Sequence, residues 1–173
     1  KFAGKLMKKN NINIDMIFSS VLQRANETAK FALEQMCLNH LWANNFLKMR
    51  RDKSLNERDY GDLVGLNKKE TADKYGKKQV HIWRRSFDVS PPGGESLKDV
   101  LNRVKPYYDT FIKPEIKRDK DILLVAHGNS LRATIIIVGL HKTEEISEIE
   151  IPTGSPFIIN FENDKITEFK YLS

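Results

Sequence analysis

Residues 122–130, Ile-Leu-Leu-Val-Ala-His-Gly-Asn-Ser, are the most informative stretch of this 173-residue sequence. Five consecutive apolar residues are typical of a strand that is buried on both faces of a parallel sheet. The apolar segment over residues 131–138 then predicts a helix that stops at Gly139. Ligands of open α/β sheets bind at the carboxyl ends of the strands, where helix N-termini also attract anions. The stretch therefore places His127 where it can contact a phosphate.

The composition indicates one globular domain with an ordinary core. Hydrophobic residues make up 40% of the chain and charged residues 30%. The apolar runs are too short to span a membrane, and no signal-peptide pattern opens the chain. The single cysteine, Cys37, excludes an internal disulfide and agrees with a reducing compartment, so we expect a cytoplasmic protein. Cys37 itself is expected to be a small buried hydrophobe in a helix.

The net charge is +6, from 29 Lys and Arg against 23 Asp and Glu. Such a balance suits nucleic acid, but it equally suits a small polyanionic substrate in a positive cleft. The lysines are scattered, and no basic-aromatic stripe or nucleic-acid motif is present. The net charge alone therefore does not decide between nucleic acid and a small polyanionic substrate. His40, His81 and His141 lack metal-ligand spacing and are expected to be structural or exposed.

Alternating helix and strand patterns precede residue 44. Residues 1–9 are typical of the later part of an amphipathic helix, and residues 15–18 predict a short strand. A helix is expected over residues 21–36, capped by Ser19 or Ser20. Strands that alternate with helices indicate an α/β fold with a mostly parallel sheet.

The segment after residue 44 mixes an irregular region with well-marked helices. Residues 44–66 are irregular and polar, and such segments in compact domains are often functional. We expect a helix capped by Asn67 and Glu70, a second helix around Trp83, and a turn over 91–94. Ser96 with Asp99 opens a long helix that is bent at Pro106, and its buried face is expected to carry Leu97, Leu101, Val104, Tyr108 and Phe111. A short apolar segment over 149–151 and a hairpin of strands 157–161 and 166–171 follow.

Each residue with chemical potential also has an ordinary explanation when it is considered alone. Arg24 can be a surface arginine, and the pair Arg84 and Arg85 can form a solvated helix face. Glu57 can be a loop carboxylate. His127 is the best candidate, because the end of a parallel strand is a common catalytic position.

Six short strings occur in order along nearly the whole chain. They are 19–25 (Ser-Ser-Val-Leu-Gln-Arg-Ala), 55–61 (Leu-Asn-Glu-Arg-Asp-Tyr-Gly), 65–72 (Gly-Leu-Asn-Lys-Lys-Glu-Thr-Ala), 83–87 (Trp-Arg-Arg-Ser-Phe), 126–133 (Ala-His-Gly-Asn-Ser-Leu-Arg-Ala) and 151–154 (Ile-Pro-Thr-Gly). With these strings the chain resembles the 2,3-bisphosphoglycerate-using phosphoglycerate mutases of the histidine phosphatase superfamily. Residues 91–96 (Pro-Pro-Gly-Gly-Glu-Ser) resemble the compact branch of that family, in which a short turn replaces a longer loop.

The resemblance implies a glycolytic isomerase that interconverts 2-phosphoglycerate and 3-phosphoglycerate, with 2,3-bisphosphoglycerate as phosphoryl primer and no metal. It implies that Glu57 is the general acid and base on the substrate hydroxyl, and that His127 stabilises the transferring phosphoryl group. Guanidinium forks suit the phosphate and carboxylate of such a substrate. The substrate-binding residues that the resemblance implies are Arg24, Arg58, Asp59, Tyr60, Lys68, Arg84, Arg85, Gly128 and Asn129.

The nucleophile of the family is a histidine in an Arg-His-Gly motif at the end of the first strand. This sequence contains no Arg-His-Gly, and its one His-Gly pair is at residues 127–128. Residues 3–6 correspond to the first helix of the family. We therefore expect one mutase-like domain over residues 1–173, incomplete at the N-terminus: a three-layer α/β fold with helices on both faces of the sheet, lacking the first strand. The chain alone is expected to be inactive or severely impaired.

Other interpretations stay open at the level of sequence. One is a general histidine phosphatase, and another is a non-catalytic remnant or one half of a split protein. A basic nucleic-acid binder rests on charge alone and predicts salt-dependent binding. Under the leading interpretation the partners are phosphoglycerates, without nucleic acid or membrane. Because the family is often dimeric or tetrameric, a homo-oligomer is a further expectation.

Overall fold

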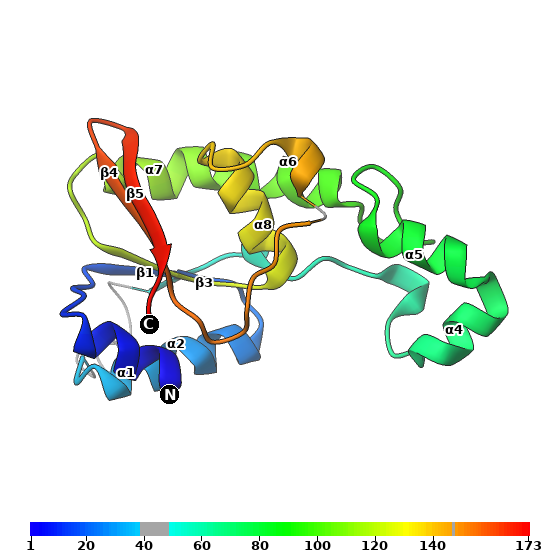
Figure 1. Ribbon diagram of the computed structural model, residues 1–173, viewed down its shortest axis with the longest axis horizontal. Helices are drawn as coiled ribbons and strands as arrows, with labels where there is room; N and C mark the ends of the chain where they lie inside the picture. The colour runs from blue at the N-terminus through cyan, green and yellow to red at the C-terminus, as the bar shows by residue number, and fades with distance from the viewer. Residues whose placement is uncertain (39–48, 147) are drawn as a thin grey trace. The chain divides into compact units, whose positions relative to one another are not determined.

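The computed structural model describes residues 1–38, 49–146 and 148–173 (Figure 1). The chain divides into two compact units, and each is described by itself. The sheet unit comprises Lys1–Asn56, Tyr107–His127 and Ile151–Ser173, and the helical unit comprises Glu57–Pro106 and Gly128–Glu150. The expectation of one domain over residues 1–173 stays a prediction.

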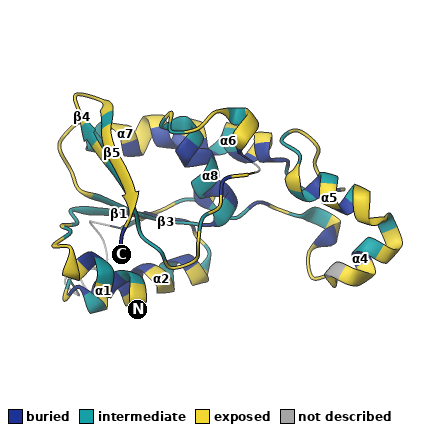
Figure 2. Ribbon diagram, in the orientation of Figure 1, coloured by how far each residue is buried: buried dark blue, intermediate teal, exposed yellow. Residues whose placement is uncertain are grey.

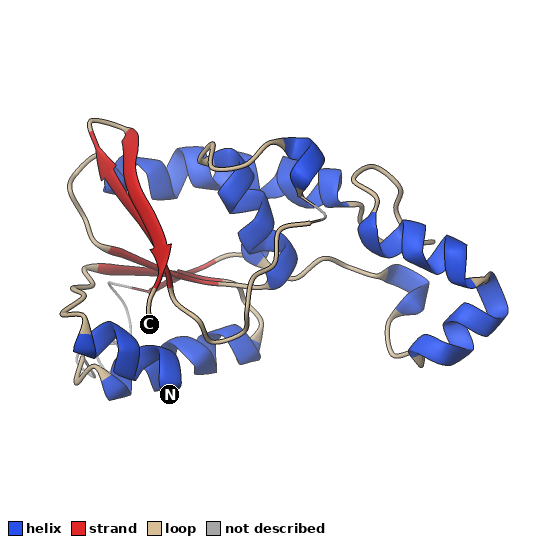
Figure 3. Ribbon diagram, in the orientation of Figure 1, coloured by secondary structure: helices blue, strands red, loops and turns tan. Residues whose placement is uncertain are grey.

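The sheet unit contains a parallel three-stranded sheet in the order β2-β1-β3 (Figure 3). These strands are β1 (Met16–Ser19), β2 (Met49–Arg51) and β3 (Ile122–Val125). Ser19 pairs in register with Val125, so the residues that follow β1 and β3 leave the sheet at the same edge. The predicted strands β1 and β3 are confirmed, whereas the three-residue strand β2 lies in a segment that we expected to be irregular.

Helices cover both faces of this sheet, which confirms the three-layer α/β architecture (Figure 1). On one face, α2 (Gln23–Gln35) buries Ala29 and Leu33 against Ile17 of β1. On the other face, the ring of Phe18 meets that of Tyr107 edge-on at 6.3 Å between centroids. Two neighbouring side chains of a strand point to opposite faces, so β1 anchors both layers. The remaining helices of the unit are α1 (Phe2–Lys9), the π-helical turn η3 (Tyr108–Ile112), α7 (Lys113–Ile116) and the short η1 (Lys53–Leu55).

Strand β3 differs from the expectation in its burial. All four of its residues are half-buried, although their sequence predicted burial on both faces. Among the described strands, β3 has one neighbour, β1, and a strand at the margin of a sheet is less covered than a central one. The predicted C-terminal hairpin is confirmed as a separate antiparallel pair, β4 (Phe157–Glu162) and β5 (Lys165–Tyr171), of which β5 is largely exposed (Figure 2).

The helical unit is built from α4 (Lys68–Tyr75), α5 (Lys77–Arg85), α6 (Leu97–Tyr107, whose last residue belongs to the sheet unit) and α8 (Gly128–Ile137), with the short turns η2 (Gly61–Leu63) and η4 (Thr143–Glu145). The caps predicted at Asn67 and Ser96 are confirmed. The side chain of Asn67 accepts the N–H of Lys69 at 2.8 Å, and Ser96 and Asp99 bond reciprocally at the start of α6. None of the described helices is long and apolar enough to cross a membrane.

The long helix changes its register beyond Pro106. We predicted Phe111 on the buried face, but Phe111 is 43% exposed and Ile112 is 2% exposed. The π-helical turn η3 explains the difference, because it adds one residue to a helical turn and so moves the buried position from 111 to 112. Pro106, which has no N–H to donate, stands two residues before this turn.

Two local expectations around α2 are wrong. Ser19 and Ser20 do not cap this helix, which begins at Gln23 with Leu22 as its N-cap. Cys37 is exposed with φ +61°, because it lies after the last turn of α2 and closes it in a Schellman arrangement: the N–H of Leu38 donates to the carbonyl of Leu33 at 2.9 Å.

Candidate functional site

The sheet unit brings together three side chains at the carboxyl ends of β1 and β3. Ser20 Oγ lies 2.8 Å from His127 Nε2, and the bond is buried. Arg24, in the first turn of α2, donates from Nε to His127 Nδ1 at 3.3 Å. The predicted strand-end position of His127 and its proximity to Arg24 are therefore features of the fold. His127 is 7% exposed, so its ring orientation is set by these contacts.

The hydrogen bonds of His127 define its tautomer. A guanidinium can only donate, so Nδ1 of His127 accepts the bond from Arg24 and carries no proton. The proton of the neutral ring then sits on Nε2 and points to Ser20 Oγ. That oxygen also accepts the N–H of Leu22 at 3.2 Å. Nε2 is therefore the donor that His127 can offer to an anion.

In the helical unit, the carboxylate of Glu57 lies in a set of donors. The side-chain amide of Asn129 donates to Glu57 Oε1 at 2.8 Å, and the N–H of Arg58 donates to the same oxygen at 2.7 Å. The Asn129 amide also reaches the hydroxyl of Tyr60 at 3.4 Å. The structure thus joins Glu57 and Tyr60, from the string 55–61, to Asn129, from the string 126–133.

Arg132 fixes which way the amide of Asn129 points. Its Nη1 donates to Asn129 Oδ1 at 3.1 Å, and its Nε donates to the carbonyl of Ile149 at 2.6 Å. With Oδ1 occupied by a donor, the NH₂ group must face Glu57. Burial and the positive charge of Arg85 lower the pKa of Arg132, against the opposite effect of Glu57. Burial is the larger of the two causes, and the charge of Arg85 adds to it.

Two guanidinium groups lie over the ring of Tyr60. The Cζ of Arg58 is 4.5 Å from the ring centroid and that of Arg84 is 5.9 Å. Arg58 is 2% exposed and its Nη2 donates to the carbonyl of Arg84 at 3.3 Å, yet its Nε and Nη1 are buried without a hydrogen-bond partner among the described residues. Unpartnered buried donors are costly, so their presence here calls for an explanation.

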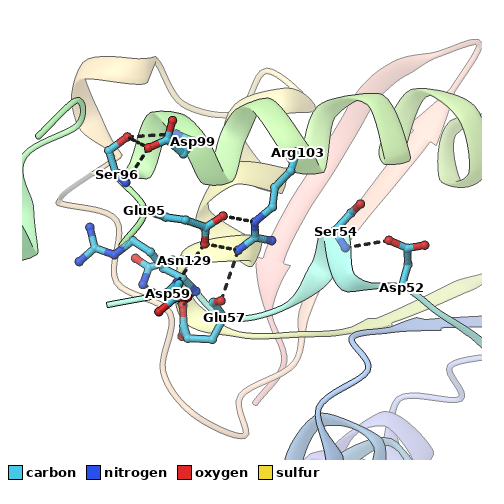
Figure 4. Close-up of polar contacts among 10 residues, drawn as sticks. Asp52, Ser54, Glu57, Asp59, Glu95, Ser96, Asp99, Arg103 and Asn129 are labelled. Carbon is cyan, nitrogen blue, oxygen red and sulfur yellow. Dashed lines mark hydrogen bonds and ion pairs between the residues drawn. The ribbon is translucent and has the colours of Figure 1, made fainter. Parts of the chain in front are cut away.

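A carboxylate–guanidinium pair lies beside the Glu57 loop (Figure 4). Arg103 of α6 donates to both carboxylate oxygens of Glu95, from Nε at 2.6 Å and from Nη2 at 2.9 Å. Burial raises the pKa of Glu95, but the hydrogen bonds from Arg103 and from the N–H of Asp59, with the Arg103 charge, outweigh it and lower the pKa.

The stability of the fold is expected to fall as the pH drops below 4.5, the ordinary pKa of glutamate. A carboxyl whose pKa is lower in the folded than in the unfolded chain stabilises the fold above the unfolded value, and that contribution is lost as the pH falls through the folded value. Urea unfolding from about pH 7 to about pH 3 should show a shallower loss in Glu95→Gln than in the wild type. Equal losses in the two proteins would contradict this origin, and Glu70→Gln on α4 is the control.

The other predicted residues are placed as follows. Gly128 opens α8, and Arg85 ends α5 with an exposed side chain. The carboxylate of Asp59 accepts the N–H of Gly61 at 2.8 Å, so it shapes the turn locally. Lys68 begins α4, but its side chain lies outside the described ones, as does His40. His81 is exposed and His141 pairs with Glu145 at 2.9 Å, as expected for histidines without a metal role. Within the described ranges, no group of three His, Cys, Asp or Glu side chains could hold a metal ion.

Comparisons with known proteins place the chain in a family. The model of the histidine phosphatase superfamily (branch 1) matches residues 2–171. A 2,3-bisphosphoglycerate-dependent phosphoglycerate mutase of Bartonella bacilliformis is 48% identical over 162 residues, which are 94% of this chain and 76% of the relative. The mutase of Mesorhizobium japonicum is 45% identical over 98% of this chain and 80% of its own. This chain belongs to the phosphoglycerate mutase family.

Solved structures agree on the fold of this phosphoglycerate mutase family member. A mycobacterial glucosyl-3-phosphoglycerate phosphatase is 22% identical and superimposes with a TM-score of 0.71 over 98% of this chain and 80% of its own. Bacillus stearothermophilus YhfR, 20% identical, gives a TM-score of 0.71 over 95% of this chain and 77% of its own. The α/β mutase-like fold inferred from the sequence is confirmed.

Four residues that contact the candidate site residues were not predicted from the sequence: Ser20, Glu95, Arg103 and Arg132. Ser20 had a signal, because it follows β1 as His127 follows β3, and parallel neighbours end at one edge. Arg132 stands within the string 126–133, one helical turn after Asn129. Glu95 and Arg103 are 8 residues apart and contact a loop some 40 residues earlier in the chain, for which no local pattern exists.

Proposed function

We propose that the activity to which this chain contributes is the interconversion of 2-phosphoglycerate and 3-phosphoglycerate, with 2,3-bisphosphoglycerate as phosphoryl primer. The observation that carries the proposal is the match to curated mutases at 45–48% identity across 94–98% of the chain. The residues around Glu57 and those around His127 both lie within the region that the family model matches. We further propose that the protein acts in the cytoplasm as a homo-oligomer, on small molecules rather than on nucleic acid or membranes.

The arginines of the helical unit fit an anionic ligand such as 2,3-bisphosphoglycerate. Among the described residues, two buried donors of Arg58 have no partner, and the charges of Arg85 and Arg58 add to burial in lowering the pKa of Arg132. A phosphate or carboxylate supplies both the acceptors and the negative charge that these groups lack. When bound, the primer supplies the phosphoryl group. We propose that Arg58, Arg84 and Arg85 hold such anions, together with Tyr60 and Lys68, while Asp59 shapes the turn beside Tyr60.

Two side chains are proposed as the catalytic residues. Glu57 transfers the proton of the substrate hydroxyl, because its carboxylate is oriented by Asn129 and can both release and accept a proton. His127 offers Nε2–H to the transferring phosphoryl group, with its ring held by Arg24 at Nδ1. The N–H groups of Gly128 and Asn129, at the start of α8, are proposed to assist it, since helix N-termini favour negative charge.

The 173-residue polypeptide by itself is proposed not to complete this reaction. It contains no Arg-His-Gly, and the family route needs that histidine to carry the phosphoryl group covalently. Removal of a covalent nucleophile costs several orders of magnitude in rate. His127 is a poor substitute for that nucleophile, since the lone pair of its Nδ1 already accepts a hydrogen bond from Arg24 Nε.

Intact mass spectrometry with 2,3-bisphosphoglycerate tests this proposal. The 20.0 kDa chain is expected to show no added phosphoryl group, because it has no nucleophilic histidine of the family type. The same chain, extended with the Arg-His-Gly segment of the Bartonella bacilliformis relative, is expected to gain one acid-labile phosphoryl group and to convert 3-phosphoglycerate.

The outcomes of this test are distinct. Labelling of the 20.0 kDa chain itself would refute its inactivity and implicate His127. An extended chain that releases inorganic phosphate without forming 2-phosphoglycerate would refute the mutase assignment in favour of a histidine phosphatase.

A further inference from the structure

We propose that Arg103 and Glu95 are positioning residues for Glu57: together they hold the main chain of residues 57–59, so that the Glu57 carboxylate stays against the amide of Asn129 (Figure 4). The functional meaning of this arrangement rests on the proposed acid–base role of Glu57. The physical arrangement itself can be tested without it.

Arg103 contacts the loop through the same nitrogen that binds Glu95. Its Nη2 donates to Glu95 Oε2 at 2.9 Å and to the main-chain carbonyl of Glu57 at 3.3 Å. The second arm of the guanidinium, Nε, donates to Glu95 Oε1 at 2.6 Å. A planar fork with both arms on one carboxylate has a fixed orientation. Arg103 therefore presents the second N–H of Nη2 to the Glu57 carbonyl in a defined direction.

Glu95 holds the other side of the same short segment. Its Oε2 accepts the N–H of Asp59 at 2.9 Å, and its own N–H donates to the carbonyl of Asp59 at 2.8 Å. The main chain at Gly94, the residue before Glu95, also packs closely against Asp59: a Cβ added to Gly94 would lie 2.8 Å from the Asp59 carbonyl oxygen. The loop is thus held at Glu57 by Arg103 and at Asp59 by Glu95.

These contacts determine where the Glu57 side chain can go. With its carbonyl bound to Arg103 and the next residues bound to Glu95, Glu57 has little main-chain freedom left. Its carboxylate then lies 2.8 Å from Asn129 Nδ2. Arg103 and Glu95 are each about three-quarters buried, at 22% and 26% exposure, so their pairing is more than a surface ion pair.

The neighbouring pair Ser96 and Asp99 provides a matched comparison. Their hydrogen bonds, at 2.6 to 3.1 Å, cap the same helix, α6, that carries Arg103. Among the described residues, no hydrogen bond joins them to residues 57–59, and Figure 4 draws no contact between them and the Arg103 pair. Loss of this cap should therefore lower stability without moving Glu57.

The test follows the side-chain NH₂ signal of Asn129 by ¹H–¹⁵N NMR in the 173-residue chain. In the wild type this signal should shift as the Glu57 carboxyl is titrated, and Glu57→Gln should abolish the shift. We expect Arg103→Met to reduce the amplitude of the shift at least twofold. Arg103→Lys keeps the charge without the fork and should restore part of the amplitude. Glu95→Gln should reduce it as well, while Ser96→Ala should leave it unchanged despite a lower stability.

Two results would overturn the proposal. One is a wild-type amplitude in Arg103→Met, or in Glu95→Gln should the former not fold. The other is an equal reduction in Ser96→Ala, which would make the effect one of general stability. Neither result depends on catalysis. If Glu57→Gln leaves the activity of the extended chain intact, the proposed function fails while the positioning contacts can still be verified.

Discussion

Replacement of Glu57 by Gln is expected to lower kcat for phosphoglycerate interconversion by about 10²- to 10⁴-fold and to leave KM nearly unchanged. Gln has the same shape as Glu and can still accept the amide of Asn129, which donates at 2.8 Å in the wild type. It cannot take up or release a proton at neutral pH. The measurement is the steady-state rate of the chain extended with the Arg-His-Gly segment of a relative, with and without the substitution.

The control for this substitution is Glu70→Gln, on the exposed surface of α4, which should keep the wild-type rate. A loss confined to KM would show that Glu57 contributes binding only. A kcat within a few-fold of the wild type would remove Glu57 from the proton transfer altogether, and the acid–base role would have to pass to another group.

Much of the fold could be predicted because its signals are local. The apolar run of β3 followed by His-Gly, the caps at Asn67 and Ser96, and the turn before β5 each depend on a few neighbouring residues. Where the sequence misled, a long-range effect prevailed. Phe111 is exposed because of a π-helical turn, and β3 is half-buried because of its place in the sheet. No local pattern encodes either.

Residues of the candidate site could be predicted from the sequence where they belong to one of the short sequence strings that resemble the family. Glu57 and Asn129 were found through two strings, although they are 72 residues apart, and the structure then joined them. The residues that hold them were not found, because an arginine or a glutamate in a helix looks like any solvated charge until its partner is known. The roles of Arg103 and Arg132 become apparent only in the structure, where Arg103 binds the carbonyl of Glu57 and Arg132 binds the amide of Asn129.

Arg58 is the residue for which stability and function are expected to conflict most strongly. It is 2% exposed, and two of its nitrogens lack partners within the part of the chain that the structure describes, which costs about 1–3 kcal/mol for each unpaired donor. Methionine has a similar length, needs no hydrogen bond, and can pack on the ring of Tyr60. Arg58→Met is therefore expected to raise the free energy of unfolding by about 1–3 kcal/mol, after the loss of the Tyr60 stacking and of the bond to Arg84.

The same substitution should weaken binding of 3-phosphoglycerate by about 10- to 100-fold, since a charge-assisted hydrogen bond to an anion contributes about 1.5–3 kcal/mol. Urea unfolding and calorimetric titration of the 173-residue chain measure the two effects. Arg118→Met, at a side chain 68% exposed, should change neither. A protein that is destabilised by Arg58→Met would show that the arginine serves the fold, and unchanged affinity would show that its unpartnered donors do not face a ligand. Only a more stable and weaker-binding variant agrees with an arginine whose burial is tolerated for the sake of an anion.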